Sequence, residues 1–286
     1  MNNEHTKPDL SQDYFQSLVD FGAATARVPA RLKLIADGEQ LTRFFVHYAS
    51  WNSRFANGVS ALVSLIGERR DLFQEKGFPR AVADRSNFIA SYIFDAARDE
   101  YNDHINPIRD THRCMAQASL ISMSAFYGLG DKVLDETEPP ALQKVNASVL
   151  PGYTGQGRSA DDDVGRVFAG IGYHLGSELL ADSEFSVIDE YLRQNRDELV
   201  QHLMRSTVEL AGGKHRCYAW VGVHSGHGGG VEADHFDYAL SGARAALKYL
   251  VGDRRKEALA SLAEGFLAFE KDHALFFSVR DEGSAE

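Results

Sequence analysis

The sequence predicts an all-α protein, a bundle of seven or more helices. Long segments carry apolar residues at helical spacing, and no segment alternates apolar and polar residues for long enough to predict a sheet. Clusters of glycine and proline separate these segments. The chain has 286 residues, of which 44% are hydrophobic and 25% are charged. This composition is typical of a globular protein with a sizeable core.

The order of elements divides the chain into two parts. Residues 1–37 are predicted to form an N-terminal extension with one short helix, which begins at Leu10 and ends near Pro29. Residues 38–280 are predicted to form a single helical-bundle domain. Glycines and prolines break the segment 128–160, which is expected to be mainly irregular and to face a substrate. Helices of the bundle are expected at residues 39–67, 85–100, 108–127, 141–150, 161–180, 186–193, 196–208, 217–223, 231–250 and 254–277.

Composition also limits the partners and the location. The net charge is −11 and the chain has no basic cluster, which argues against nucleic acid and anionic membranes as partners. No apolar run is long enough for a membrane span, and the N-terminus lacks the features of a signal peptide, so a cytoplasmic location is expected. Two cysteines, Cys114 and Cys217, are too few for a disulfide framework or a thiolate metal site.

The strongest functional signal is the segment Val231–Tyr238. Glu232 and His235 are three residues apart and therefore share one helical face, which continues through apolar residues such as Leu240 and Ala243. An unpaired carboxylate on an inward face costs several kcal/mol, roughly, unless a partner neutralises it. Glu-x-x-His on an inward face is the way in which carboxylate di-iron bundles supply ligands to their metals. An exposed Glu–His pair beside a core stripe would have the same spacing.

Further carboxylates and imidazoles stand on the apolar faces of other predicted helices. Glu100 occupies a position where the stripe of its helix calls for an apolar residue, and so does Glu178. His112 lies in the first turns of the next helix, and the break at Pro107 would bring it near Glu100. Alone, each has a plain explanation in a surface ion pair or a hydrogen-bonded core histidine. Together they predict a site with oxygen and imidazole ligands, which suits Fe, Mn or Zn.

The order of these motifs resembles the haem-oxygenase-like di-iron oxidase and oxygenase superfamily. Its members include fatty-acid decarboxylases that make terminal alkenes, amino-acid-fragmenting oxidases and N-oxygenases. The resemblance extends over roughly residues 38–250 and rests on the segments 95–101, 110–113, 172–178 and 231–236. It implies a haem-oxygenase-like bundle, two Fe(II) ions per chain or an Fe/Mn pair, and O2 as co-substrate. The ligands that it implies are Glu100, His112, Glu178, Glu232, His235 and one histidine upstream of Glu232.

That upstream histidine is either His227 or His224. The family usually spaces the last histidine, acid and histidine at i, i+4 and i+7, but the first of these positions is Gly228 here. His227 fits with one inserted residue, and His224 fits if the glycine-rich stretch unwinds. His227 is preferred and His224 is retained. His104, four residues after Glu100, is the alternative to His112.

The resemblance implies a non-haem iron oxidoreductase that reduces O2 to a peroxide bridging two irons and oxidises a small molecule. An amino acid, an amine and a fatty acid are the substrate classes considered. The catalytic residues would be Glu100, His112, Glu178, Glu232 and His235. The metal identity and the oligomeric state, monomer or homodimer, stay open.

Two other hypotheses about the function remain. The first is another enzyme on the same bundle: a haem oxygenase with His47 as proximal ligand, a thiaminase-type hydrolase with a nucleophilic cysteine, or a cofactorless oxidase. The second is a metal-binding or interaction bundle without catalytic activity.

Overall fold

The protein is described by a computed structural model over residues 10–102, 109–135, 138–159, 161–225 and 231–279. These residues form a bundle of many more than seven helices with one small hairpin, so the predicted all-α class is confirmed. The hairpin pairs β1 (Thr207–Leu210) with β2 (Gly213–Arg216). Two short 3-10 turns lie at Arg70–Leu72 and Asp131–Val133. The α-helices are α1 (Gln12–Ser17), α2 (Phe21–Leu32), α3 (Gly38–Asn52), α4 (Phe55–Glu68), α5 (Arg80–Ala83), α6 (Ser86–Tyr101), α7 (His112–Tyr127), α8 (Pro140–Thr154), α9 (Asp163–Asn195), α10 (Asp197–Arg205), α11 (Ala219–His224), α12 (Val231–Leu247) and α13 (Asp253–Ser278).

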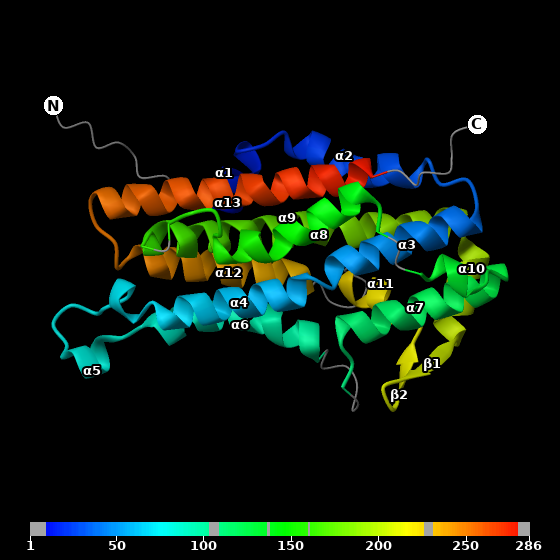
Figure 1. Ribbon diagram of the computed structural model, residues 1–286, viewed down its shortest axis with the longest axis horizontal. Coiled ribbons are helices and arrows are strands. Elements are labelled where there is room, and N and C mark those ends of the chain that lie inside the picture. Colours follow the sequence, from blue (N-terminus) through cyan, green and yellow to red (C-terminus); the bar gives the residue numbers. More distant parts are fainter. Residues whose placement is uncertain (1–9, 103–108, 136–137, 160, 226–230, 280–286) are drawn as a thin grey trace.

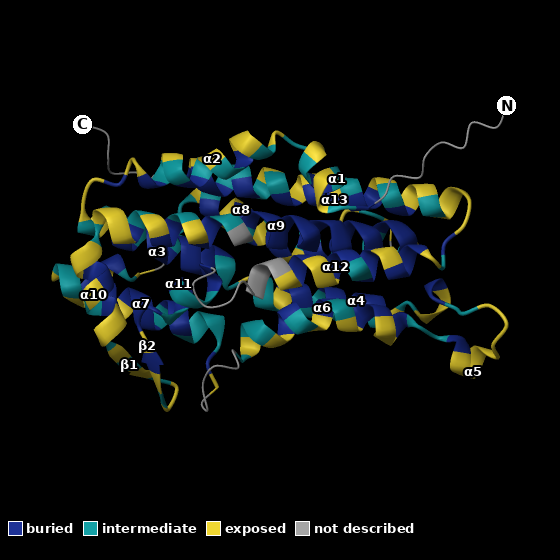
Figure 2. Cartoon of the chain, turned by 180° about the vertical axis from the view of Figure 1, so that it is seen from behind, coloured by how far each residue is buried: buried dark blue, intermediate teal, exposed yellow. Residues whose placement is uncertain are grey.

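Helix α9 lies at the centre of this arrangement. It runs beside α13 along the long axis of the molecule, and α2, α8 and α12 also pack against it (Figure 1). The pair α4 and α6 packs beneath α12, while α3 and α7 pair toward the other end. Most of α9 is buried (Figure 2). Because α2 contacts both α9 and α13, the N-terminal helices are attached to the bundle; the domain boundary near residue 37 stays a prediction.

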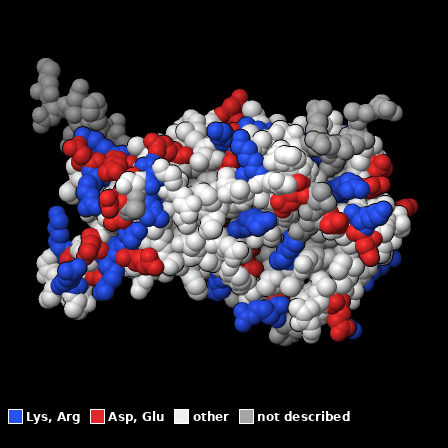
Figure 3. All heavy atoms as spheres, in the orientation of Figure 1, with Lys and Arg blue, Asp and Glu red and all other residues white. Residues whose placement is uncertain are grey.

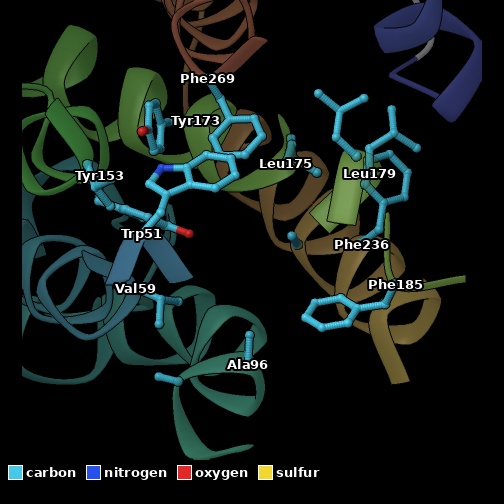
Figure 4. Packing of buried hydrophobic residues seen from close by; sticks show 14 of the residues in the cluster. Trp51, Val59, Ala96, Tyr153, Tyr173, Leu175, Leu179, Phe185, Phe236 and Phe269 are labelled. Atoms are coloured by element: carbon cyan, nitrogen blue, oxygen red, sulfur yellow. The ribbon is translucent and has the colours of Figure 1, made fainter. Parts of the chain in front are cut away.

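The core between α3, α8, α9 and α13 is aromatic. Trp51 stacks on Phe276 with ring centroids 4.4 Å apart, and it lies parallel to Phe269 at 6.0 Å. Tyr173 meets Phe269 edge to face, as the labelled side chains in Figure 4 show. Full burial of one such ring stabilises the fold by roughly 1.5–3 kcal/mol. This packing fixes the position of α9 relative to α3 and α13.

Glycines bring the backbones of α9 and α13 into direct contact. A Cβ atom on Gly172 of α9 would overlap the carbonyl group of Leu262, and one on Gly265 of α13 would overlap the carbonyl group of Ala169. Both obstacles are backbone atoms of a packed helix, which cannot move aside as a flexible side chain can. Only glycine is compatible with this separation of the two helix axes.

The surface carries charges of both signs. On the face in Figure 3, Lys and Arg are interspersed with Asp and Glu, most densely over the end that carries α5. There Arg70 pairs with Asp84 at 2.6 Å and Arg80 with Asp71 at 3.0 Å. None of the helices in the described ranges has the length and apolar character that crossing a bilayer requires. The absence of a nucleic-acid partner stays a prediction.

Several predicted boundaries were wrong. The single helix expected over 39–67 is two helices, α3 and α4, because Asn52 and Ser53 at the junction hydrogen-bond backward to the carbonyl groups of Tyr48 and Ser50. Such bonds compete with continuation of the helix. The first predicted helix is likewise two: the Asp20 carboxylate caps α2 at the amide of Ala23.

Other segments are more regular than expected. Helix α9 continues to Asn195 where two helices were predicted, because no glycine or proline interrupts it after Gly176. The connection over 128–160 contains α8, which is 15 residues long. The hairpin was missed because its strands have only four residues each. Ala211 and Gly212 form its turn, both with positive φ (51° and 79°).

The contact between α9 and α13 makes a direct prediction about stability. Gly172→Ala and Gly265→Ala should each lower the free energy of unfolding by about 1–3 kcal/mol, because the new methyl group meets backbone atoms. The matched control is Gly22→Ala, since a Cβ at this exposed helical position has only an ordinary contact at 3.6 Å. The control should be neutral or slightly stabilising. Urea unfolding measures all three variants, and equal stabilities would contradict the close approach.

Candidate functional site

A cavity of about 220 Å³ lies among α3, α4, α6, α7, α8, α9, α11 and α12. Apolar side chains form part of its wall, including Val59, Ala96 and Phe185, which lie around a common space in Figure 4. Five of the residues singled out in the sequence, each from a different helix, line this one cavity. They are Glu100 of α6, His112 of α7, Glu178 of α9, His224 of α11 and His235 of α12.

The remaining candidates cannot be placed. His227 and the alternative His104 lie outside the described residues. Glu232 belongs to α12, but its side chain lies outside the described part of the structure. The choice between His227 and His224 as the upstream histidine therefore stays open, although His224 is the one that is seen to line the cavity.

Glu100 and His112 form one pair at the cavity wall. Glu100 ends α6 and His112 begins α7, and His112 Nδ1 lies 3.2 Å from Glu100 Oε2. Thr111 caps α7 by accepting a hydrogen bond from the amide of Cys114, which fixes the first turn that carries His112. Both side chains line the cavity and are mostly covered, with 19% of Glu100 and 15% of His112 left accessible.

Glu178 lies between two imidazoles. Its Oε1 is 3.2 Å from Nδ1 of His174, one turn earlier on α9, and its Oε2 is 3.6 Å from Nδ1 of His235 on α12. All three residues are buried. The buried carboxylate is thus flanked by imidazoles from two helices.

Asp99 orients His235 from the opposite side. His235 Nε2 lies 3.1 Å from Asp99 Oδ2, and because a carboxylate accepts, this nitrogen donates. Burial raises the pKa of Asp99, but the hydrogen bond and charge of His235, together with Arg98, outweigh it and hold the pKa below its usual value. With Nε2 bonded to Asp99, the other ring nitrogen, Nδ1, lies on the side of Glu178.

His224 is oriented in the same manner. Its Nδ1 lies 2.6 Å from the carbonyl oxygen of Trp220, which can only accept, so Nδ1 donates. In the neutral ring, Nε2 then carries the lone pair. The ring stacks on Phe185 at a centroid distance of 4.4 Å and meets His112 edge-on at 4.4 Å.

Hydrogen bonds attach α11, the helix of His224, to α9. The Tyr218 hydroxyl, just before α11, donates to the buried Asp189 of α9, and Arg193 pairs with the same carboxylate at 2.8 Å. Burial and the Asp189 carboxylate both raise the pKa of Tyr218, so the hydroxyl stays protonated and remains a donor. This contact holds α11 close to α9 although α10 and the hairpin separate them in the sequence.

A second buried pair fixes the start of α7. Asp110, two residues before His112, has its Oδ1 2.6 Å from Nδ1 of His215 in β2, and His215 Nε2 lies 3.1 Å from the carbonyl oxygen of Leu210. Asp110 and His215 are almost fully buried. The hairpin therefore anchors the segment that leads into the cavity wall.

The donor chemistry of the cavity fits a divalent metal ion such as iron, because carboxylate oxygens and imidazole nitrogens are the ligands that such ions take in helical bundles. The orienting bonds of His224 and His235 are also those of metal-ligating histidines. The close contacts, however, are pairwise. Among the residues that the structure describes, no group of three or more His, Cys, Asp or Glu side chains has the geometry to hold a metal ion.

The residues named for the competing functions lie elsewhere. His47, Cys114 and Cys217 are absent from the described lining of the cavity. Burial raises the pKa of Cys217, which keeps its thiol protonated and poorly nucleophilic. The described lining of this cavity therefore supports neither the haem-oxygenase hypothesis nor the thiaminase-type hypothesis.

Sequence reasoning missed Asp99 and His174. His174 stands four residues before Glu178, and this spacing on a buried helix was a usable signal for an imidazole–carboxylate contact. Asp99 had no such signal, because its contact with His235 depends on how α12 packs against α6.

Comparison with known proteins adds nothing to this geometry. No family model, curated protein or solved structure matches the chain.

The Asp110–His215 pair can be tested by a double-mutant cycle. Asp110→Asn and His215→Ala should each lower the free energy of unfolding by about 1–3 kcal/mol, because a buried polar group loses its partner. The double variant should lose less than the sum of the two, with a coupling of at least about 0.5 kcal/mol. Glu198→Ala, at an exposed position of α10, is the control and should change stability little. Strictly additive losses would show that the pair does not anchor α7.

Proposed function

We propose that the protein is an O2-activating non-haem di-iron oxidase or oxygenase that acts on a small molecule. One observation carries the proposal: carboxylates and imidazoles from five helices, selected for their sequence pattern alone, line a single cavity. Burial of each ionisable group costs free energy, so we would not expect five of them to line one cavity unless they had a function there. The resemblance of the motif order to the haem-oxygenase-like di-iron superfamily supports the same function.

The ligands in this proposal are Glu100, His112, Glu178 and His235, together with Glu232 and one of His224 and His227. Two Fe(II) ions bound by them would supply the electrons and the Lewis acidity for O2 reduction. Metal binding would replace the pairwise contacts between these carboxylates and imidazoles. In that exchange each carboxylate would gain a positive partner, and the imidazoles would keep the outer bonds that orient them.

The rest of the chain supports this chemistry by orientation and by exclusion of water. Asp99 and the Trp220 carbonyl group hold the rings of His235 and His224, so that one nitrogen of each remains for a ligand. Phe185 and Trp220, both buried, close one wall of the cavity. A dry wall strengthens the electrostatic interactions of the groups beside it.

Iron stoichiometry tests the proposal. Anaerobic titration with Fe(II) should saturate near two ions per chain, with the second bound more weakly, and the loaded protein should consume O2. Glu178→Gln keeps the shape of the side chain but removes its charge, and it should reduce the bound iron to one ion or fewer. His202→Ala, outside the cavity, should still bind two. A stoichiometry of zero, or haem binding with a Soret band, would overturn the function.

The upstream histidine can be identified by the same titration. His224→Ala should lose the weaker iron, because His224 lines the cavity and presents Nε2 as its unprotonated nitrogen in the neutral ring. His227→Ala should retain two ions. The opposite result would assign the ligand to His227, in agreement with the sequence preference.

A further inference from the structure

One cation lines the cavity among the residues that the structure describes. It is Arg113, directly after His112 in the first turn of α7, and its side chain is half-buried. Its Nη1 donates to the carbonyl oxygen of Ala49 on α3 at 3.2 Å, and Ala49 also lines the cavity. This bond fixes the guanidinium where α3 and α7 meet at the cavity wall. An arginine has five N–H donors, so it can bind an acceptor in the cavity in addition to the partners that it already has.

The charge of the cavity favours an anionic ligand in the metal-loaded protein. The other charged side chains in its described lining are Glu100 and Glu178. Two divalent ions would exceed the charge of these carboxylates, and would still do so with Glu232 added. With Arg113 the loaded cavity is positive, which attracts a carboxylate and repels a cationic amine. The positive end of the α7 dipole, at the same wall, acts in the same direction.

The size and lining of the cavity narrow the anion further. Its volume of about 220 Å³ lies below the roughly 300–1,000 Å³ of typical small-molecule pockets. Polar side chains share the wall with apolar ones: Asn52 and Asn57 lie there together with the small Ala49 and Ala56 and the aromatic Phe185 and Trp220. The Tyr101 hydroxyl donates to Asn57 Oδ1 at 3.2 Å, so the amide nitrogen of Asn57 is left as a donor. A short molecule with several polar groups fits this lining better than a long alkyl chain.

We propose that Arg113 binds the carboxylate of an amino-acid-sized substrate in this cavity. The proposal rests on the proposed function for the reaction and for the positive charge of the metal-loaded cavity, whereas the contact between Arg113 and the carboxylate can be measured separately. Among the three substrate classes considered, it selects the amino acid over the amine and the long-chain fatty acid. A guanidinium suits this role because its planar fork matches the two oxygens of a carboxylate.

Binding to Zn(II)-loaded protein tests the proposal without O2 chemistry. Calorimetry would compare the common free amino acids with their carboxamides, with the corresponding decarboxylated amines and with dodecanoate. At least one free amino acid should bind, and its carboxamide and amine should bind at least 10-fold more weakly. Arg113→Gln should weaken binding of that amino acid roughly 10- to 100-fold, because a charged hydrogen-bond partner is lost. Arg113→Lys should restore part of the affinity.

The control is Arg109→Gln, an exposed arginine just before α7 that is not in the described lining of the cavity. It should bind the amino acid as the unaltered protein does. Urea unfolding of the Arg113 variants shows whether a loss of binding is caused by a loss of folding. If Arg113→Gln does not fold, Arg113→Lys still tests the proposal, because lysine keeps a donor for the Ala49 carbonyl group.

Three results would overturn the inference: no free amino acid binds, dodecanoate binds more tightly than any of them, or affinity depends on the metal but not on Arg113. The last would mean that the metal itself holds the carboxylate. Repeating the measurement on metal-free protein, alongside the iron titration, keeps the two proposals apart. Two irons per chain with no effect of Arg113 would refute only the substrate assignment. Arg113-dependent binding with no iron site would refute only the di-iron function.

Discussion

The direct backbone contact between α9 and α13 is the constraint on which the other features depend. Gly172 and Gly265 let the two longest helices touch, and the aromatic layer around Trp51 then packs against both. With α9 fixed in the centre, one of its faces is turned to α13 and another to the cavity, where Glu178 and Phe185 lie. A bulkier residue at either glycine would shift the helix that carries Glu178. Packing far from the cavity therefore sets the geometry inside it.

Electrostatics decides how the cavity groups are held. Each carboxylate of the described lining faces an imidazole: Glu100 faces His112, while Glu178 faces both His174 and His235. The imidazoles are held in turn by outer acceptors, such as Asp99 for His235. Such a network keeps the side chains ordered before any ligand arrives, which reduces the entropy lost on binding.

The sequence was informative where the signal was local. An acid or imidazole on an apolar helical stripe is visible from spacing alone, and this is why Glu100 and Glu178 were found and the all-α class was right. The role of Asp99 was invisible, because it neighbours Glu100 and acquires its partner only when α12 crosses α6. The break between α3 and α4 was missed for a related reason, since it depends on side-chain bonds made by Asn52 and Ser53 rather than on glycine or proline. The spacing of apolar residues shows which face of a helix is buried, but not which residues of other helices pack against that face.

The cavity also determines how the chain responds to what it binds. Its described lining runs from Ala49 to His235, and the helices that supply it are distant in the sequence. Contacts of such long range require closure of large loops, which slows their formation. No short fragment of the chain contains the whole described lining, so a ligand of this cavity binds the folded protein. Occupancy then shifts the folding equilibrium of the entire chain. Resistance of the protein to proteolysis would accordingly rise with the concentration of its own ligand.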